Sequence, residues 1–104
     1  MFDLNQKVVI VTGASRGIGR GIAEMLAGRG AHIVAAARAD NAAATVESIQ
    51  RAGGSAETGS LDVTDSGSVE TLVEAVLTRH GRIDVLVNNA GIARDQLMLR
   101  MKRE

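Results

Sequence analysis

Cysteine, proline, tyrosine and tryptophan are all absent from this chain of 104 residues, and Phe2 is its one aromatic residue. Without cysteine there is no disulfide framework and no thiolate metal site. A single aromatic side chain offers no platform on which the bases of a single-stranded nucleic acid could stack. These absences argue against a disulfide-stapled protein, a zinc finger and a single-strand binder.

An excess of charge of either sign is also missing, because 12 basic and 12 acidic side chains cancel. This balance argues against a nucleic-acid partner and against a polybasic membrane patch. No apolar run is long enough to span a bilayer, and no signal peptide opens the chain. His32 and His80 lie far apart in the sequence and make a poor metal pair. We therefore expect one small cytoplasmic domain over residues 1–104, with no metal, nucleic-acid or membrane partner.

Apolar runs that suit strands alternate with runs that have helical periodicity. Strands are predicted at 7–12, 31–37, 55–61 and 83–87, and helices at 18–28, 41–52 and from Asp65 or Ser66 to Gly81. Strands that are apolar throughout are buried on both faces, so the sheet should be parallel, with helices on both sides. Right-handed crossovers then predict a Rossmann-like, doubly wound α/β fold of four strands, in the order 3-2-1-4 by analogy with dinucleotide-binding folds.

Apolar stripes predict which side of each helix faces the sheet. The inward residues should be Ile18, Ile22, Met25 and Leu26 in the first helix, Val46 and Ile49 in the second, and Val69, Leu72, Val73, Val76 and Leu77 in the third. The tail, residues 92–104, carries further apolar residues. It could form a helix or be a frayed terminus.

A glycine-rich stretch, TGASRGIG, joins the first predicted strand to the first predicted helix at residues 12–19. A helix N-terminus offers free N–H groups and a partial positive charge, and glycines let a phosphate approach that backbone closely. The spacing is neither G-x-G-x-x-G nor that of a Walker loop. The turn alone therefore leaves two interpretations open, a phosphate site and a tight strand-to-helix connection.

Two further motifs occur with this turn: LDVTD at 61–65 and NNAG at 88–91. Together the three motifs resemble the short-chain dehydrogenase/reductase family, from Lys7 to the end of the chain. The sequence NNAGIARDQLMLRMK is most similar to the 3-oxoacyl-[acyl-carrier-protein] reductase branch, which serves fatty acid biosynthesis. The resemblance implies the N-terminal, cofactor-binding half of an oxidoreductase, and a truncated half of the family fold.

The resemblance also implies a binding site for a nicotinamide dinucleotide. The pyrophosphate and adenosine ribose would lie against Gly13, Ala14, Ser15, Arg16, Gly17, Ile18 and Gly19. Asp62 would accept from the adenine amino group, Val63 would supply a backbone contact, and Asn89, Ala90 and Gly91 would lie along a ribose. Each has a plainer alternative: Asp62 could cap a turn, and the asparagines could simply end a strand.

The end of the second predicted strand bears on the choice of cofactor. A carboxylate there would bind the ribose hydroxyls of NAD and repel a 2′-phosphate. The sequence instead has Arg38 at this point, with no carboxylate before Asp40. Arg38 and Arg16 could bind the 2′-phosphate of NADP, as guanidinium groups bind phosphates in a bidentate manner. NADP is therefore expected over NAD, although both arginines could also be solvated surface charges.

Catalysis in the resembled family uses a tyrosine and a lysine four residues apart, helped by a serine and an asparagine. This chain has no tyrosine. No residue is therefore assigned a catalytic role, and the 104 residues alone are expected to be catalytically incomplete. The alternatives are a nucleotide-binding module without catalysis and a self-associating half-domain. In either case the apolar fourth strand should be an open edge through which chains could pair as a homo-oligomer.

Overall fold

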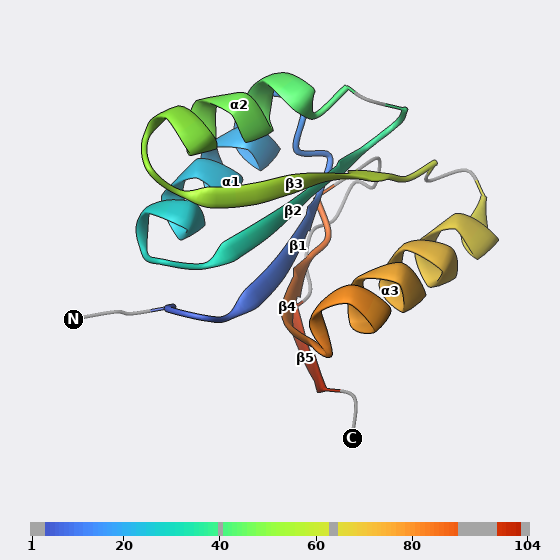
Figure 1. The fold of residues 1–104 in the computed structure, drawn as a ribbon. Helices are drawn as coiled ribbons and strands as arrows, with labels where there is room; N and C mark the ends of the chain where they lie inside the picture. Colours follow the sequence, from blue (N-terminus) through green and yellow to red (C-terminus); the bar gives the residue numbers. More distant parts are fainter. Residues whose placement is uncertain (1–3, 40, 63–64, 90–97, 103–104) are drawn as a thin grey trace.

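Four parallel strands form the centre of the protein, with helices on both faces (Figure 1). The computed structural model describes residues 4–39, 41–62, 65–89 and 98–102. The elements in chain order are β1 (Val8–Thr12), α1 (Gly17–Gly28), β2 (His32–Ala37), α2 (Ala43–Arg51), β3 (Ser55–Ser60), α3 (Ser66–His80), β4 (Arg82–Val87) and β5 (Met98–Lys102). The order of the parallel strands is β3-β2-β1-β4, so the Rossmann-like prediction is confirmed.

A fifth strand, β5, corrects two expectations. Met98–Lys102 pairs antiparallel with β4, instead of forming a helix or a frayed end. The pairing brings Arg82 opposite Lys102 and Val87 opposite Met98. The fourth strand is therefore not the open edge that was expected to join two chains, because β5 covers it. The rest of the tail, residues 92–97 and 103–104, lies outside the described residues.

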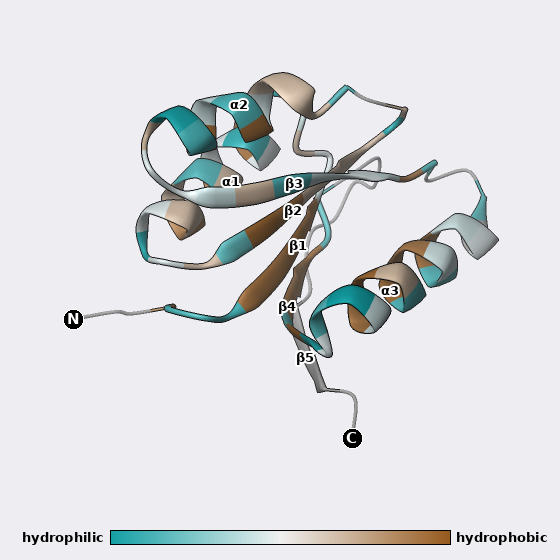
Figure 2. Ribbon diagram, in the orientation of Figure 1, coloured by the Kyte–Doolittle hydropathy of each residue, from teal (hydrophilic) through white to brown (hydrophobic). Residues whose placement is uncertain are grey.

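Side chains from the central strands pack into two apolar clusters, one on each face of the sheet. Along β1, Val9 and Val11 face α1 and α2, whereas Val8 and Ile10 face α3. All four side chains are buried, and Figure 2 shows β1 and β2 as the most hydrophobic part of the ribbon. Strands with two buried faces need cover on both sides, which is why the helices lie in two layers.

The first helix packs through smaller residues than the apolar stripe predicted. Gly19, Ala23 and Ala27 are its buried residues, while Ile18 is 74% exposed and Met25 is 56% exposed. Small side chains at i, i+4 and i+8 form one face and let the helix axis come close to the sheet. The predicted inward position is thus wrong for Ile18 and Met25, whereas Ile22 and Leu26 do pack against the core.

The third helix begins and ends where its capping residues predict. The Asp65 carboxylate accepts a hydrogen bond from the backbone N–H of Gly67, which resolves the choice between Asp65 and Ser66. Gly81 follows the helix with φ of 78°, in the left-handed region that favours glycine. Leu72 and Val76 are buried as predicted, but Val69 is 38% exposed. No helix within the described residues is long and apolar enough to cross a membrane.

A buried carboxylate joins the amino ends of β1 and β4. Asp84 is 2% exposed and accepts the backbone N–H of Val8 at 2.9 Å and the Arg82 guanidinium at 2.7 and 2.8 Å. Burial opposes its ionisation, but the hydrogen bonds from Arg82 and Val8 outweigh burial and lower the pKa of Asp84. The side chain therefore acts as an ionised clamp between two strands that are far apart in the sequence.

Candidate functional site

The glycine-rich turn lies at the carboxyl end of β1 and leads directly into α1. Gly13 has a backbone φ of 64° and Gly17 has a φ of 63°, values that residues other than glycine rarely adopt. Gly19 is constrained differently, because a Cβ there would lie 2.0 Å from the Gly13 carbonyl oxygen and 2.8 Å from Nδ2 of Asn89. The turn, the first residues of α1 and the end of β4 therefore meet at one point.

Hydrogen bonds to and from two threonine hydroxyls hold this arrangement together. The Thr12 hydroxyl accepts the backbone N–H of Asn89 at 2.8 Å and lies 3.2 Å from Oδ1 of Asn88. Thr45, fully buried on α2, donates to the Ala14 carbonyl at 2.7 Å. The turn is thus braced from β4 on one side and from α2 on the other.

Sequence reasoning missed both threonines. A signal was present for Thr45: it lies four residues before Ile49, on the inward side of the second predicted helix. A hydroxyl at such a position needs a partner inside the protein. Its partner could not be named, because the Ala14 carbonyl belongs to a distant segment.

The first turn of α1 suits an anion. Arg16 occupies the N-cap position with an extended backbone, and within the described part of the chain its side chain makes no capping hydrogen bond. The first turn also carries no acidic residue. Helix α3, in contrast, is capped by its own Asp65. The leading N–H groups of α1 and its positive dipole end are therefore available to a phosphate at the carboxyl edge of the sheet.

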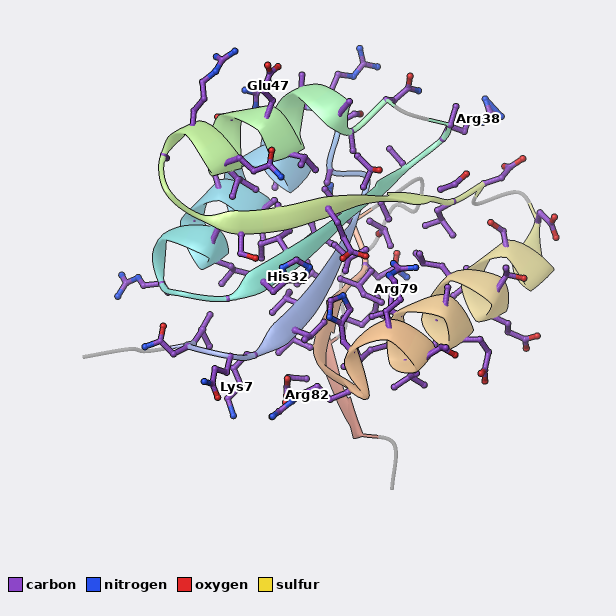
Figure 3. The ribbon with its side chains drawn as sticks, viewed as in Figure 1. Lys7, His32, Arg38, Glu47, Arg79 and Arg82 are labelled. Carbon is purple, nitrogen blue, oxygen red and sulfur yellow. The ribbon has the colours of Figure 1, made fainter. Side chains whose placement is uncertain are left out.

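Arg38 and Asp62 lie at the same edge of the sheet, directly beyond β2 and β3. Arg38 is exposed, and Figure 3 shows it at the far end of β2. Its Nη2 is 4.0 Å from Oδ1 of Asp62, and the two side chains are 66% and 45% exposed. Such an exposed pair contributes little to stability.

The predicted site residues fall into three groups. Gly13, Ala14, Ser15, Arg16, Gly17, Ile18 and Gly19 form the turn and the first residues of α1, with Asn89 beside Gly19. Arg38 and Asp62 lie together on the neighbouring strand ends. The other three predicted residues, Val63, Ala90 and Gly91, lie outside the described residues.

A known protein family also matches this chain in sequence. The sequence model of the short chain dehydrogenase family matches residues 7–104. The chain belongs to this family. Members of the family bind a nicotinamide dinucleotide, and the glycine turn and uncapped α1 suit such a ligand: they combine a backbone without side-chain bulk and N–H groups aimed at an anion.

Individual relatives and solved structures are also similar to this chain. The 3-oxoacyl-[acyl-carrier-protein] reductase FabG of Escherichia coli is 48% identical over 98 residues, covering 94% of this chain and 39% of the relative. The FabG of Vibrio cholerae is 44% identical over 102 residues, covering 98% and 41%. Among solved structures, a metagenomic short-chain oxidoreductase in complex with NADP superimposes with a TM-score of 0.81 at 46% identity, covering 86% of this chain and 41% of that one. The chain thus spans about two fifths of the length of the relatives it matches.

Proposed function

We propose that this chain forms the cofactor-binding half of an NADP-dependent 3-oxoacyl-[acyl-carrier-protein] reductase or a close relative in the short-chain dehydrogenase family. The observation that carries the proposal is the contact at Gly19, where α1 approaches the Gly13 carbonyl too closely for any side chain. This closeness packs the glycine-rich turn against the start of α1, and helix N–H groups beside such a turn are suited to hold a diphosphate. The likeness to FabG enzymes supports the choice of reaction.

Six residues of the site would hold different parts of the dinucleotide. The N–H groups of Gly17, Ile18 and Gly19 bind the pyrophosphate, and the Asp62 carboxylate accepts from the adenine amino group. Arg16 and Arg38 bind the 2′-phosphate. When bound, NADPH supplies hydride to a carbonyl carbon of the substrate.

We propose that the 104 residues bind the cofactor without turnover. No tyrosine is present to polarise a carbonyl, so that group must come from outside these residues. A nucleotide-binding module without catalysis is the second candidate function, and it rests on the same observation. Reduction of an acetoacetyl thioester by this chain with NADPH would contradict both statements.

The choice of cofactor is tested by calorimetry with NADPH, NADH and 2′-phospho-AMP. We expect the two ligands that carry a 2′-phosphate to bind more tightly than NADH. Loss of a charge-assisted hydrogen bond costs about 1.5–3 kcal/mol, so Arg38→Gln should weaken NADPH binding roughly 10- to 100-fold with little change for NADH. Arg38→Asp should reverse the preference. Arg51→Gln is the matched control, because Arg51 is similarly exposed but lies at the end of α2 beside Glu47. Equal affinity for all three ligands would refute the arginine argument.

A further inference from the structure

Two histidines and a glutamate meet near the amino ends of β2 and β3, at the opposite end of the strands from the glycine-rich turn. His32 is the first residue of β2, Glu57 lies in β3, and His80 is the last residue of α3. The centroids of the two imidazole rings are 4.7 Å apart. The expectation that these two histidines make a poor metal pair is therefore wrong, because the fold brings the end of α3 onto the first residues of β2 and β3.

The ring nitrogens converge on a single oxygen atom. Nε2 of His32 and Nε2 of His80 each lie 3.0 Å from Oε1 of Glu57. All three atoms lie within 4.8 Å of one another. Ligands bound tetrahedrally to zinc at about 2.1 Å are themselves about 3.4 Å apart. The two 3.0 Å separations are close to this value, so small rotations of the side chains would admit an ion.

Neighbouring groups orient two of the three side chains. His32 pairs in register with Ser55, and its Nδ1 shares a hydrogen bond with the Ser55 hydroxyl, which leaves Nε2 directed at Glu57. Arg79 bonds the other carboxylate oxygen, Oε2, and leaves Oε1 to the imidazoles. Figure 3 shows Arg79 extending from α3 toward the sheet. Hydrogen bonds of this kind, behind the ligand atoms, orient the ligands in metal sites of proteins.

The electrostatics of the cluster also suit a cation. Glu57 supplies a carboxylate oxygen that both imidazoles face. His80 ends α3, where the helix dipole presents partial negative charge. The three side chains are 21–26% exposed, so an ion and a water molecule can reach them.

We propose that His32, Glu57 and His80 bind one divalent transition-metal ion, Zn²⁺ above all, with the fourth position left to water. Two imidazole nitrogens and one carboxylate oxygen form a donor set typical of zinc. The bound ion would fasten the end of α3 to β2 and β3. Because the cluster lies at the opposite end of the strands from the glycine turn, this site is independent of the proposed cofactor site.

The test uses the untagged chain, titrated with ZnCl₂ by calorimetry near pH 7.5 without nucleotide. We expect one ion per chain and a higher thermal midpoint with zinc, reversed by a chelator. His32→Gln, His80→Gln and Glu57→Gln should each weaken binding about tenfold or more, since each removes a ligand. Glu47→Gln is the matched control: Glu47 is also paired with an arginine, Arg51, at 3.1 Å but has neither histidine of the cluster beside it. Equal weakening by the control, or unchanged binding in the histidine variants, would overturn the proposal.

A second measurement needs no variant. The chain contains only two histidines and no cysteine, so its proton NMR spectrum holds two imidazole Hε1 signals. Both signals should shift or broaden together and saturate at one equivalent of Zn²⁺. If both stay in place at that point, or if only one responds, the three-ligand site does not exist.

Discussion

The contact at Gly19 gives the sharpest test of how the turn is built. In Gly19→Ala the new methyl carbon would lie 2.0 Å from the Gly13 carbonyl oxygen, whereas ordinary van der Waals contact begins at 3.4 Å. The neighbour is backbone, which cannot rotate away as a side chain can. The helix and the turn must therefore separate by over an ångström, and the N–H groups at the start of α1 move with the helix.

The magnitude follows from two opposing effects on the free energy of unfolding. Alanine is about 1 kcal/mol better than glycine inside a helix, but overpacking against a rigid neighbour costs about 1–3 kcal/mol. Gly19→Ala should therefore lose up to about 2 kcal/mol of stability. Gly21→Ala, two residues further along the same helix, should gain about 0.5–1 kcal/mol, because no described atom lies within 4 Å of a Cβ there.

Urea unfolding followed by far-ultraviolet circular dichroism measures both effects, since the chain has no tryptophan or tyrosine to report by fluorescence. Calorimetry with NADPH supplies the functional readout, in which we expect Gly19→Ala to weaken binding about tenfold or more and Gly21→Ala to leave it unchanged. If both variants gain stability and bind NADPH as the original chain does, the close approach at Gly19 is not what shapes the site.

Three further substitutions test other parts of the structure. Thr45→Val removes the hydroxyl that donates to the Ala14 carbonyl. We expect the free energy of unfolding in urea to fall by about 1–3 kcal/mol and NADPH to bind more weakly. An unchanged unfolding midpoint would show that this hydrogen bond does not stabilise the turn. Asp84→Asn removes a buried charge that pairs with Arg82 and should cost about 3 kcal/mol, and a loss below 1 kcal/mol would contradict the clamp. The pKa of Glu57 is lowered from 4.5 to about 2, so its ionised form stabilises the fold above pH 4.5. This contribution is at most about 3 kcal/mol, and it is lost as the pH falls from 4.5 toward 2. Glu57→Gln should thus be less stable near pH 6, with the gap closing in acid; a constant gap across urea series from pH 6 to pH 2 would refute the linkage.

The order of strands and helices along the chain was predictable because its signals are local, whereas the order of strands in the sheet followed from analogy with dinucleotide-binding folds. Apart from Thr12 and His32, β1 and β2 consist of valine, isoleucine and alanine, and such apolar runs already imply two buried faces. Gly81 and Asp65 mark the ends of α3 by their own conformational preferences. For the candidate cofactor site, the turn at residues 12–19 could likewise be read directly, because its glycines and the following helix are contiguous.

Tertiary packing alone decided the rest. Ile18 and Met25 were expected inward, but the small residues Ala23 and Ala27 face the sheet, because close approach of α1 excludes larger side chains. β5 exists only through its pairing with β4.

The meeting of His32, Glu57 and His80 depends on strand register and on where α3 ends. The sequence by itself determined the order of the elements and the glycine turn, since these depend on neighbours along the chain. Only the tertiary structure decided which side chains from distant parts of the sequence lie close together, because a crossover connection brings together residues that no local sequence pattern connects.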